Sequence, residues 1–478
     1  MEFETVIGLE VHAQLATNTK IFCRCSTEFG LDPNFNTCPV CLGLPGVLPT
    51  INEKAVKFAL MLGLATNCDI NSNSQFARKN YFYPDLPKAY QTSQFDLPIC
   101  ENGWLDIDVD GKTKRIGITR IHMEEDAGKL VHDGEDENAS YVDLNRAGIP
   151  LVEIVSEPDI RTSAEAKAYM EKIHSIVTHL EICNGNMEKG NLRCDANVSI
   201  RPFGQKEFGI RTETKNLNSF KNVQAAIQYE VARQTDAILD GEKIIQQTRL
   251  WDANQKRSKV LRTKEDSDDY RYFPCPDLPR IKLNQFDIDA AKKDLPELPD
   301  EKKERYQHQF QLSYHDASIL VSDKKLSLFF EKTIALGTDA KIATNWILGE
   351  IARLLNEKQI PIDDAKITPD LLIGLIQLIQ NNTISGKIAK TVLIEMFETG
   401  KKAIAVVEEK GLKQVTDESE IVAICQEIIS ANQKQVEQYQ NGKTKVFGFF
   451  VGQVMKQTKG KANPKIVNNL LKDLLSQQ

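Results

Sequence analysis

Along this chain the spacing of apolar residues changes once, at a segment with two prolines, Asp294-Leu295-Pro296-Glu297-Leu298-Pro299-Asp300. Short alternating segments dominate the region before it, and a period of two residues is typical of strands with one buried face. After it, apolar residues recur at the period of 3.6 residues that indicates amphipathic helices. A single all-β or all-helical domain is therefore excluded, and the architecture is expected to change near residue 293.

The first region is predicted to be an α+β body built around an antiparallel sheet. Strands are expected over residues 6–15, 114–123, 141–155 and 193–201. In the first of these strands Glu10, His12 and Gln14 share one face, and in the last Asp195 and Asn197 do so. Two longer helices are expected near residues 163–180 and 219–239.

The second region carries start and stop signals of several helices. Thr368-Pro369 is an N-cap followed by proline at the first helical position, and Gly400 is a typical end for the helix that begins near Ser385. Residues 416–419 and Asn463-Pro464 each precede a further helical pattern. We therefore expect three domains, which are a body of residues 1–293, a helical domain of residues 294–403 and a small helical tail of residues 404–478.

The composition is that of a globular protein, with 41% hydrophobic and 27% charged residues. No apolar run reaches the roughly 18 residues of a membrane span, and the acidic start is not a signal peptide, so a cytoplasmic protein is expected. The net charge of −7 is not that of a typical nucleic-acid binder. From Asn441 onward, however, seven lysines against one acidic residue give +6. The tail is therefore a candidate polyanion-binding patch, and a solvated helix face is the alternative.

Four of the ten cysteines form a C-x-C…C-x-x-C cluster, which consists of Cys23, Cys25, Cys38 and Cys41. In a chain without a signal peptide a disulfide framework is not expected. Close thiolate pairs suit tetrahedral zinc, and four thiolates leave no open coordination position, so a structural zinc knuckle over residues 23–41 is predicted. Four reduced structural cysteines, or a redox pair of Cys38 and Cys41, are the alternatives.

Acidic residues on the expected strands are the main candidates for chemistry. The sequence has no G-x-x-x-x-G-K-[ST], G-x-G-x-x-G, H-E-x-x-H or G-x-S-x-G motif. The candidate acids are Glu10, Glu124, Glu125, Glu153, Asp195 and Glu213. Carboxylates gathered on one sheet repel one another unless a cation neutralises them, and hard oxygen ligands suit Mg²⁺. Each acid taken singly also fits a solvated or salt-bridged strand residue, so spacing alone indicates no specific reaction.

Longer segments carry a resemblance to a known family. They are residues 6–12 (VIGLEVH), 78–85 (RKNYFYPD), 122–129 (HMEEDAGK), 142–146 (VDLNR), 193–199 (RCDANVS), 269–274 (DYRYFP) and, in the tail, 448–455 (GFFVGQVM). In this order they resemble the B subunits of the bacterial glutamine-dependent aspartyl/glutamyl-tRNA amidotransferases. The similar archaeal E subunits have an extra inserted domain, for which 478 residues leave no room.

The resemblance implies a catalytic cradle related in fold to glutamine synthetase, followed by a helical domain and a tRNA-binding tail. It also implies a heterotrimer with an amidase (A) subunit, which releases ammonia from glutamine, and a small C subunit. This chain would bind tRNA misacylated with glutamate or aspartate and phosphorylate the side-chain carboxylate with ATP. Ammonia would then convert the acyl phosphate to the amide, giving Gln-tRNA(Gln) or Asn-tRNA(Asn).

The resemblance further implies roles for individual residues and cofactors. The Mg²⁺ ligands, direct or through water, would be Glu10, His12, Glu124, Glu125, Asp195 and Glu213, with Glu153 as a further catalytic candidate. Arg211 and Lys215 face the same way as Glu213 and are expected to hold ATP phosphates. Lys456, Lys459 and Lys461 are expected to contact tRNA phosphates. Zinc would be structural.

Two other functions are compatible with parts of the pattern. A non-catalytic scaffold that only positions tRNA for the partner would explain the basic tail but has no need of clustered acids. A two-metal nuclease would explain the acids but not a family that acts together with a glutaminase. The acid set therefore favours an enzyme subunit, a tRNA-dependent carboxylate kinase and transamidase.

Overall fold

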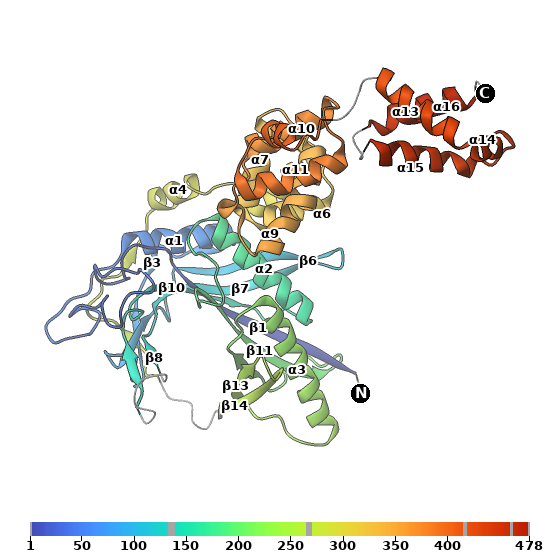
Figure 1. Cartoon of the computed structure of the whole chain (residues 1–478). Coiled ribbons are helices and arrows are strands. Elements are labelled where there is room, and N and C mark those ends of the chain that lie inside the picture. The colour runs from blue at the N-terminus through green and yellow to red at the C-terminus, as the bar shows by residue number, and fades with distance from the viewer. Residues whose placement is uncertain (1, 132–138, 264–269, 414–417, 459–461, 477–478) are drawn as a thin grey trace. The chain divides into compact units, whose positions relative to one another are not determined.

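The computed structural model describes residues 2–131, 139–263, 270–413, 418–458 and 462–476 (Figure 1). The chain divides into two compact units, residues 1–299 and 300–478, and each is described by itself. Among the described helices, none combines the length and the apolar character that crossing a lipid bilayer requires.

A twelve-stranded sheet forms the centre of the first unit. Its main path runs β14-β13-β12-β11-β1-β10-β7-β5-β4-β15, and β6 and β2 continue from β7. The strands are β1 (Phe3–Gln14), β2 (Asp69–Ile70), β4 (Ala77–Asn80), β5 (Tyr90–Ser93), β6 (Cys100–Val109), β7 (Lys112–Glu125), β10 (Pro150–Ser156), β11 (Leu192–Pro202), β12 (Thr212–Lys215), β13 (Gln247–Asp252), β14 (Arg257–Thr263) and β15 (Phe273–Pro274). Two small ribbons pair β3 (Asn73–Ser74) with β16 (Ile281–Lys282) and β8 (Lys129–Val131) with β9 (Tyr141–Asp143).

The sheet is mixed rather than purely antiparallel, which corrects the prediction from the sequence. In its described part, β12 and β13 pair in parallel, whereas pairs such as β1 with β10 and β1 with β11 are antiparallel. The helix α3 (Phe220–Leu239) lies between β12 and β13 in the chain and acts as a crossover that returns the backbone in the same direction. The first unit is thus α+β, as predicted.

Three predicted strands form where the alternation is strongest, as β1, β7 and β11. The expected strand over residues 141–155 is instead divided into β9 and β10. A turn interrupts it, and within this turn Gly148 has a φ of +86°, which is a left-handed conformation that extended strands do not contain. The helix α1 (Glu53–Ala65), which Asn52 caps, was not predicted.

Helices cover one face of the sheet. The strand residues that alternate with the buried ones lie on the opposite face. Leu9, Val11 and Ala13 of β1 are buried in one core with Tyr169 and Ile173 of α2 (Ser163–His179). Helix α3 packs against β11 in the same core, and Figure 1 shows both helices beside the sheet. Both predicted helices begin at hydroxyl N-caps, Thr162 for α2 and Ser219 for α3. A short helix, α4 (Gln285–Lys293), ends the unit.

The second unit is helical, as the period of 3.6 residues predicts. Its helices are α5 (Pro299–Phe310), α6 (Tyr314–Ser322), α7 (Lys324–Ala335), α8 (Ala340–Asn345), a π-helical segment (Trp346–Ile351), α9 (Ala352–Lys358), α10 (Pro369–Gln380), α11 (Gly386–Thr399), α12 (Ala403–Glu409), α13 (Glu418–Ala431), α14 (Gln433–Gln440), α15 (Phe447–Gln457) and α16 (Pro464–Ser476). Thr368 caps α10, Ser385 caps α11, and Gly400 ends α11 in the left-handed conformation, as predicted. The proposed caps at residues 416–417 lie outside the described residues.

This unit contains two separate hydrophobic cores. One extends from Tyr306 in α5 to Val407 in α12, and the other from Ile421 in α13 to Leu475 in α16. Apolar residues at helical spacing in the tail predict an inner seam of Val446, Phe450, Val454, Ile466 and Leu470. Phe450 and Val454 are fully buried in the second core, as predicted, whereas Val446, Ile466 and Leu470 are only partly buried. The fully buried residues of the last helix include Val467 and Leu471, which lie one residue beyond the predicted positions.

Candidate functional site

The sheet face opposite α2 and α3 carries most of the predicted catalytic residues. On β1 the partly exposed Glu10 and His12 alternate with buried apolar residues. Antiparallel pairing places Asp195 of β11 directly opposite Glu10, and Glu153 of β10 directly opposite His12. Because strand neighbours in register share a face, side chains that are far apart in the sequence form two compact groups.

The first group, here called the Glu10 cluster, consists of Glu10, Asp195 and Glu213, each of which offers an oxygen within 4.8 Å of the others. Lys215 Nζ lies 2.5 Å from Asp195 and 2.7 Å from Glu213, so its ammonium occupies a position where a metal ion would neutralise the same acids. Burial and then the neighbouring carboxylates raise the pKa of Glu10. Burial opposes ionisation of Glu213 as well, but Lys215 lowers its pKa overall.

The second group, here called the His12 cluster, consists of His12, Glu124 and Glu153. His12 Nε2 lies 3.6 Å from Glu124 and 3.4 Å from Glu153, and His122 Nε2 lies 3.2 Å from Glu153. Burial alone would lower the pKa values of both histidines, but Glu153 and Glu124 raise them, to about 9 for His122. The carboxylate of Glu153, which interrupts an apolar run in β10, is therefore neutralised by the imidazolium groups of His12 and His122.

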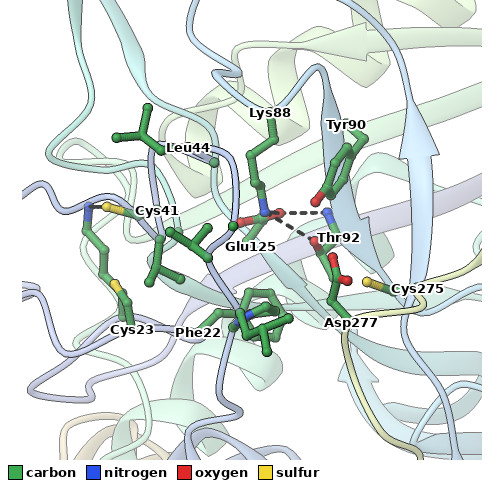
Figure 2. A pocket seen from close by; sticks show the side chains of 18 residues that line it. Phe22, Cys23, Cys41, Leu44, Lys88, Tyr90, Thr92, Glu125, Cys275 and Asp277 are labelled. Carbon is green, nitrogen blue, oxygen red and sulfur yellow. Dashed lines mark hydrogen bonds and ion pairs between the residues drawn. The ribbon is translucent and has the colours of Figure 1, made fainter.

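Glu125 is not brought to either cluster. Its carboxylate accepts hydrogen bonds from Lys88 Nζ and from the backbone amide of Thr92. These three residues line a cavity of about 490 Å³ whose other walls include Cys23 and Cys41. Figure 2 shows Lys88, Thr92 and Glu125 joined on one side of this cavity, with the two cysteines on the other. Glu124 and Glu125 are neighbours in β7, but their carboxylates enter different surroundings.

The two residues expected to hold ATP phosphates have different environments. Arg211 is exposed directly before β12, and it lines a cavity of about 170 Å³ together with Glu10, Glu213 and Arg262. Lys215 pairs with the acids of the Glu10 cluster instead. The small cavity thus combines two guanidinium groups with two carboxylates, which is a donor set that fits a metal-bound phosphate.

The four cysteines meet as predicted, with Sγ atoms within 4.8 Å of one another. Cys38 and Cys41 have their sulfurs 3.9 Å apart, close to the roughly 3.8 Å edge of a zinc–thiolate tetrahedron. A hydrogen bond from Cys23, the amide of Cys38 and the ammonium of Lys20 lower the pKa of the Cys41 thiol to about 5. Lys20 is fully buried and its Nζ lies 3.7 Å from Cys41 Sγ, where it balances thiolate charge. The cluster can therefore bind a metal ion, and its chemistry fits zinc.

Behind β12, a buried ionic network supports the strand that carries Glu213. The fully buried Glu230 of α3 accepts a hydrogen bond from Thr212 at 2.6 Å and two from Arg233, and Arg249 lies 3.5 Å away. Gln234 Nε2 also donates hydrogen bonds to Val198 O and to the hydroxyl oxygen of Thr212. The network links α3 to β11, β12 and β13, and it was not predicted because its polar residues lie in an apolar helix pattern.

Replacing Glu230 with glutamine is expected to lower the free energy of unfolding of this unit by about 3 kcal/mol, because Arg249 and Arg233 lose their buried counter-charge. Burial opposes ionisation, but the hydrogen bonds from Arg233 lower the pKa of Glu230 overall. Its contribution is therefore present above the ordinary glutamate pKa and is lost as the pH falls through the lowered value. Urea unfolding followed by tryptophan fluorescence at several pH values measures both effects.

The control is Asp106→Asn, which breaks an exposed ion pair with Arg115 and is expected to leave the free energy of unfolding nearly unchanged. Equal stability of Glu230→Gln and wild type near neutral pH would contradict the prediction.

Comparisons with known proteins match most of the chain. The family model described as "GatB/GatE catalytic domain" matches residues 5–289, and the model described as "GatB domain" matches residues 328–475. The chain belongs to the GatB/GatE family. The catalytic-domain model spans both acid clusters and the cysteine cluster, and the GatB domain model covers the first helical core from residue 328 onward and the second core.

Individual relatives in the GatB/GatE family match from end to end. The B subunit of the aspartyl/glutamyl-tRNA(Asn/Gln) amidotransferase of Desulfotalea psychrophila is 56% identical over 476 residues, which is 100% of each chain. The equally named protein of Trichlorobacter lovleyi is 57% identical, again over 100% of each chain. That of Thermodesulfovibrio yellowstonii is 53% identical over 100% of each chain.

Sequence reasoning missed several polar residues of this GatB/GatE site. His122 lies at the start of a quoted motif, and its alternation with Glu124 in β7 is the signal that could have revealed it. Arg193 and the buried Asp126 form an ion pair at 2.9 Å beside the His12 cluster, with the arginine partly exposed. Of the predicted tRNA contacts, Lys456 is exposed on α15, and Lys459 and Lys461 lie outside the described residues.

Proposed function

We propose that this chain is the B subunit of an aspartyl/glutamyl-tRNA amidotransferase, an ATP-dependent ligase of protein biosynthesis. The single observation that carries the proposal is the pair of carboxylate clusters on one sheet face of a chain whose full-length relatives bear that name. Its reaction converts Glu-tRNA(Gln) and Asp-tRNA(Asn) to the corresponding amides. A protein that only positioned tRNA would have no reason to gather partly buried acids beside two guanidinium groups.

The proposed reaction has two steps. An oxygen of the substrate's side-chain carboxylate attacks the γ-phosphorus of ATP, an O–P bond forms, and the bond to the β-phosphate oxygen breaks to release ADP. Ammonia then attacks the acyl carbon, the C–O bond to phosphate breaks, and inorganic phosphate leaves with the amide formed. Both steps concentrate negative charge, so positioning and charge neutralisation are the tasks of the protein.

The chain's own residues divide these tasks. Arg211 and Arg262 in the small cavity orient the phosphates, and the two acid clusters hold the cations. Mg²⁺ bound there would neutralise the γ-phosphoryl group and align it with the carboxylate. A cation at the Glu10 cluster would share Asp195 and Glu213 with Lys215, whose ammonium contacts both acids. His12 and Glu153 would hold the second cation, and zinc at the cysteines would have a structural role.

The proposal extends to partners and domains. The relatives are named as one subunit of an amidotransferase, which indicates a complex of several subunits. We assign an amidase (A) subunit and a small C subunit as its partners in a cytoplasmic heterotrimer. Residues 1–293 would be the catalytic cradle, with the fold relationship to glutamine synthetase expected from the sequence. Residues 294–403 would be a helical domain, and residues 404–478 a tRNA-binding tail.

The test follows three substrates in the chain alone and in the complete heterotrimer. With ATP, glutamine and Glu-tRNA(Gln), only the heterotrimer is expected to form Gln-tRNA(Gln). With ammonium chloride in place of glutamine, the amide should form even when the amidase serine is inactivated, because activation of the carboxylate is assigned to this chain. ATP hydrolysis that did not depend on charged tRNA, or amide formation without ATP, would contradict the assignment and favour the scaffold function.

Reversing the charge of single tail lysines is expected to raise the apparent KM for charged tRNA severalfold. Lys443, Lys456 and Lys472 are exposed around the second helical core, where lysines contact phosphates without reading bases. Each Lys→Glu variant should also reduce the slope of log affinity against log salt by a little under one unit. Lys341→Glu and Lys387→Glu, on exposed sites of α8 and α11, are the controls with the same change of charge.

Steady-state rates measure the apparent KM, and filter binding across a range of salt concentrations measures the slope of log affinity against log salt. The tRNA-independent glutaminase rate of the partner should be equal in all five variants. Wild-type affinity and an unchanged salt slope in the three tail variants would show that these lysines are only solvated surface.

A further inference from the structure

Arg193 lies on the acid-lined face and shares its nearest carboxylate with a second arginine. It lies on β11 directly opposite His12 of β1, on the same face as Asp195. Its Nη2 lies 2.9 Å from Asp126 Oδ2, but Arg146 Nε lies 3.5 Å from the same oxygen. Asp126 also accepts a hydrogen bond from Gln14 at 2.8 Å. A single carboxylate is thus shared by two guanidinium groups.

The two arginines use their donors differently. Arg146 donates to two backbone carbonyls, Ala127 O at 3.0 Å and Gly128 O at 2.6 Å. In the described part of the chain, Arg193 Nε and Nη2 are shielded from solvent and donate no well-aligned hydrogen bond. The Arg193 side chain is nevertheless 36% exposed, so the rest of the group opens toward the site. A ligand would therefore bind the exposed part of the guanidinium group, while the shielded nitrogens stay on the side of Asp126.

The surroundings of Arg193 define the ligand as an anion. The His12 cluster lies on one side of it, and Asp195 follows it on the same strand face. Such a row of carboxylates repels an anionic substrate unless a cation is available to bind it. Lys215 is not available in the same way, because its ammonium is held between Asp195 and Glu213. The planar fork of a guanidinium group matches the two oxygens of a carboxylate.

We propose that Arg193 binds the side-chain carboxylate of the glutamate or aspartate that is esterified to the tRNA, and so distinguishes the acid substrate from its amide product. This inference rests on the proposed function, since it names the residue that recognises the group to be phosphorylated. Position supports it, because Arg193 lies beside the His12 cluster while the small cavity assigned to phosphates adjoins the Glu10 cluster. The carboxylate would then be held between the two clusters.

The test measures binding without turnover. The assembled heterotrimer is titrated, without ATP, with tRNA that carries glutamate or glutamine through a non-hydrolysable amide link, and with uncharged tRNA. Wild type is expected to bind the glutamyl form about tenfold more tightly than the glutaminyl form. Arg193→Gln should remove this preference and leave the affinity for uncharged tRNA unchanged. Arg193→Lys, which keeps a charge beside Asp126 but not the fork, should retain part of it.

The matched control is Arg115→Gln, an arginine on β7 that pairs with Asp106 and lies over Trp104. It should keep the full preference. In steady-state assays Arg193→Lys should raise the KM for Glu-tRNA and leave the KM for ATP unchanged. A wild type without preference, an Arg193→Lys variant with the full preference, or a change confined to the KM for ATP would each overturn the proposal. Preference without amide formation in wild type would instead overturn only the proposed function.

Discussion

Glu10→Gln and Glu213→Gln are each expected to reduce tRNA-dependent ATP hydrolysis by about a thousandfold or more. Both residues belong to the Glu10 cluster, and each substitution replaces a charged oxygen donor by an amide. Losing one metal ligand costs about 4 kcal/mol of transition-state stabilisation, which corresponds to roughly three orders of magnitude in rate. The measurement is ADP release by the heterotrimer with saturating Glu-tRNA(Gln), over a series of Mg²⁺ concentrations.

The control is Asp106→Asn on β6, an acid whose partner is Arg115 and which lies in neither cluster. It should hydrolyse ATP at the wild-type rate. The partner's glutaminase activity should persist in all three variants, because no step at the amidase active site uses these acids. If both Glu10→Gln and Glu213→Gln formed the amidated tRNA at a near-normal rate, the assignment of carboxylate activation to this sheet face would be wrong.

The double variant Cys38→Ser/Cys41→Ser is expected to lose one tightly bound zinc ion per chain and to unfold at a clearly lower temperature. In a structural site the binding free energy of the metal is part of the folding free energy. Serine keeps the volume of the side chain but not a soft thiolate, so two of four ligands disappear. Elemental analysis of protein purified without chelator, together with calorimetry, checks both outcomes.

Cys68→Ser is the matched control, since Cys68 is a free cysteine outside the cluster. It should keep the zinc and most of the stability. Activity of the double variant measured below its melting transition should remain, because the cysteines have no proposed chemical role. A wild-type protein that contains no zinc would refute the cluster as a zinc site.

The strand faces were predictable because their period is strict. A side chain in β1 or β11 can lie only on one of two faces, so alternation with buried apolar residues was enough to place Glu10 and His12 on one face of β1 and Asp195 on one face of β11. The pairing of β1 with β11, which brings Asp195 opposite Glu10, was not predicted. Helix ends at Thr368 and Gly400 were predictable for a similar reason, since capping depends on local chemistry.

What the sequence did not reveal depends on contacts between distant segments. The separation of Glu125 from Glu124 follows from Lys88 and Thr92, which approach β7 from another part of the chain. Helix α1 was missed because its sequence is apolar on several sides, from Ala55 to Ala65, and so lacks a clear amphipathic period. The parallel pairing of β12 with β13 is a matter of topology, and neither strand's own sequence specifies its neighbour.

Under the proposed function, the ammonium of Lys215 between Asp195 and Glu213 distinguishes the magnesium site assigned to the Glu10 cluster from the zinc site assigned to the cysteines. Because this lysine is a built-in counter-ion, the acids it touches are held in place when magnesium is absent. We therefore expect the sheet to fold without a divalent ion, and a magnesium ion bound at the Glu10 cluster would exchange with this internal charge as each nucleotide binds and leaves. At the cysteine cluster the ammonium of Lys20 contacts Cys41, and one ammonium cannot hold four sulfur ligands in a tetrahedron. Under the proposed function we thus expect the Glu10 cluster to bind magnesium reversibly during catalysis, and the cysteine cluster to bind its zinc once, at folding.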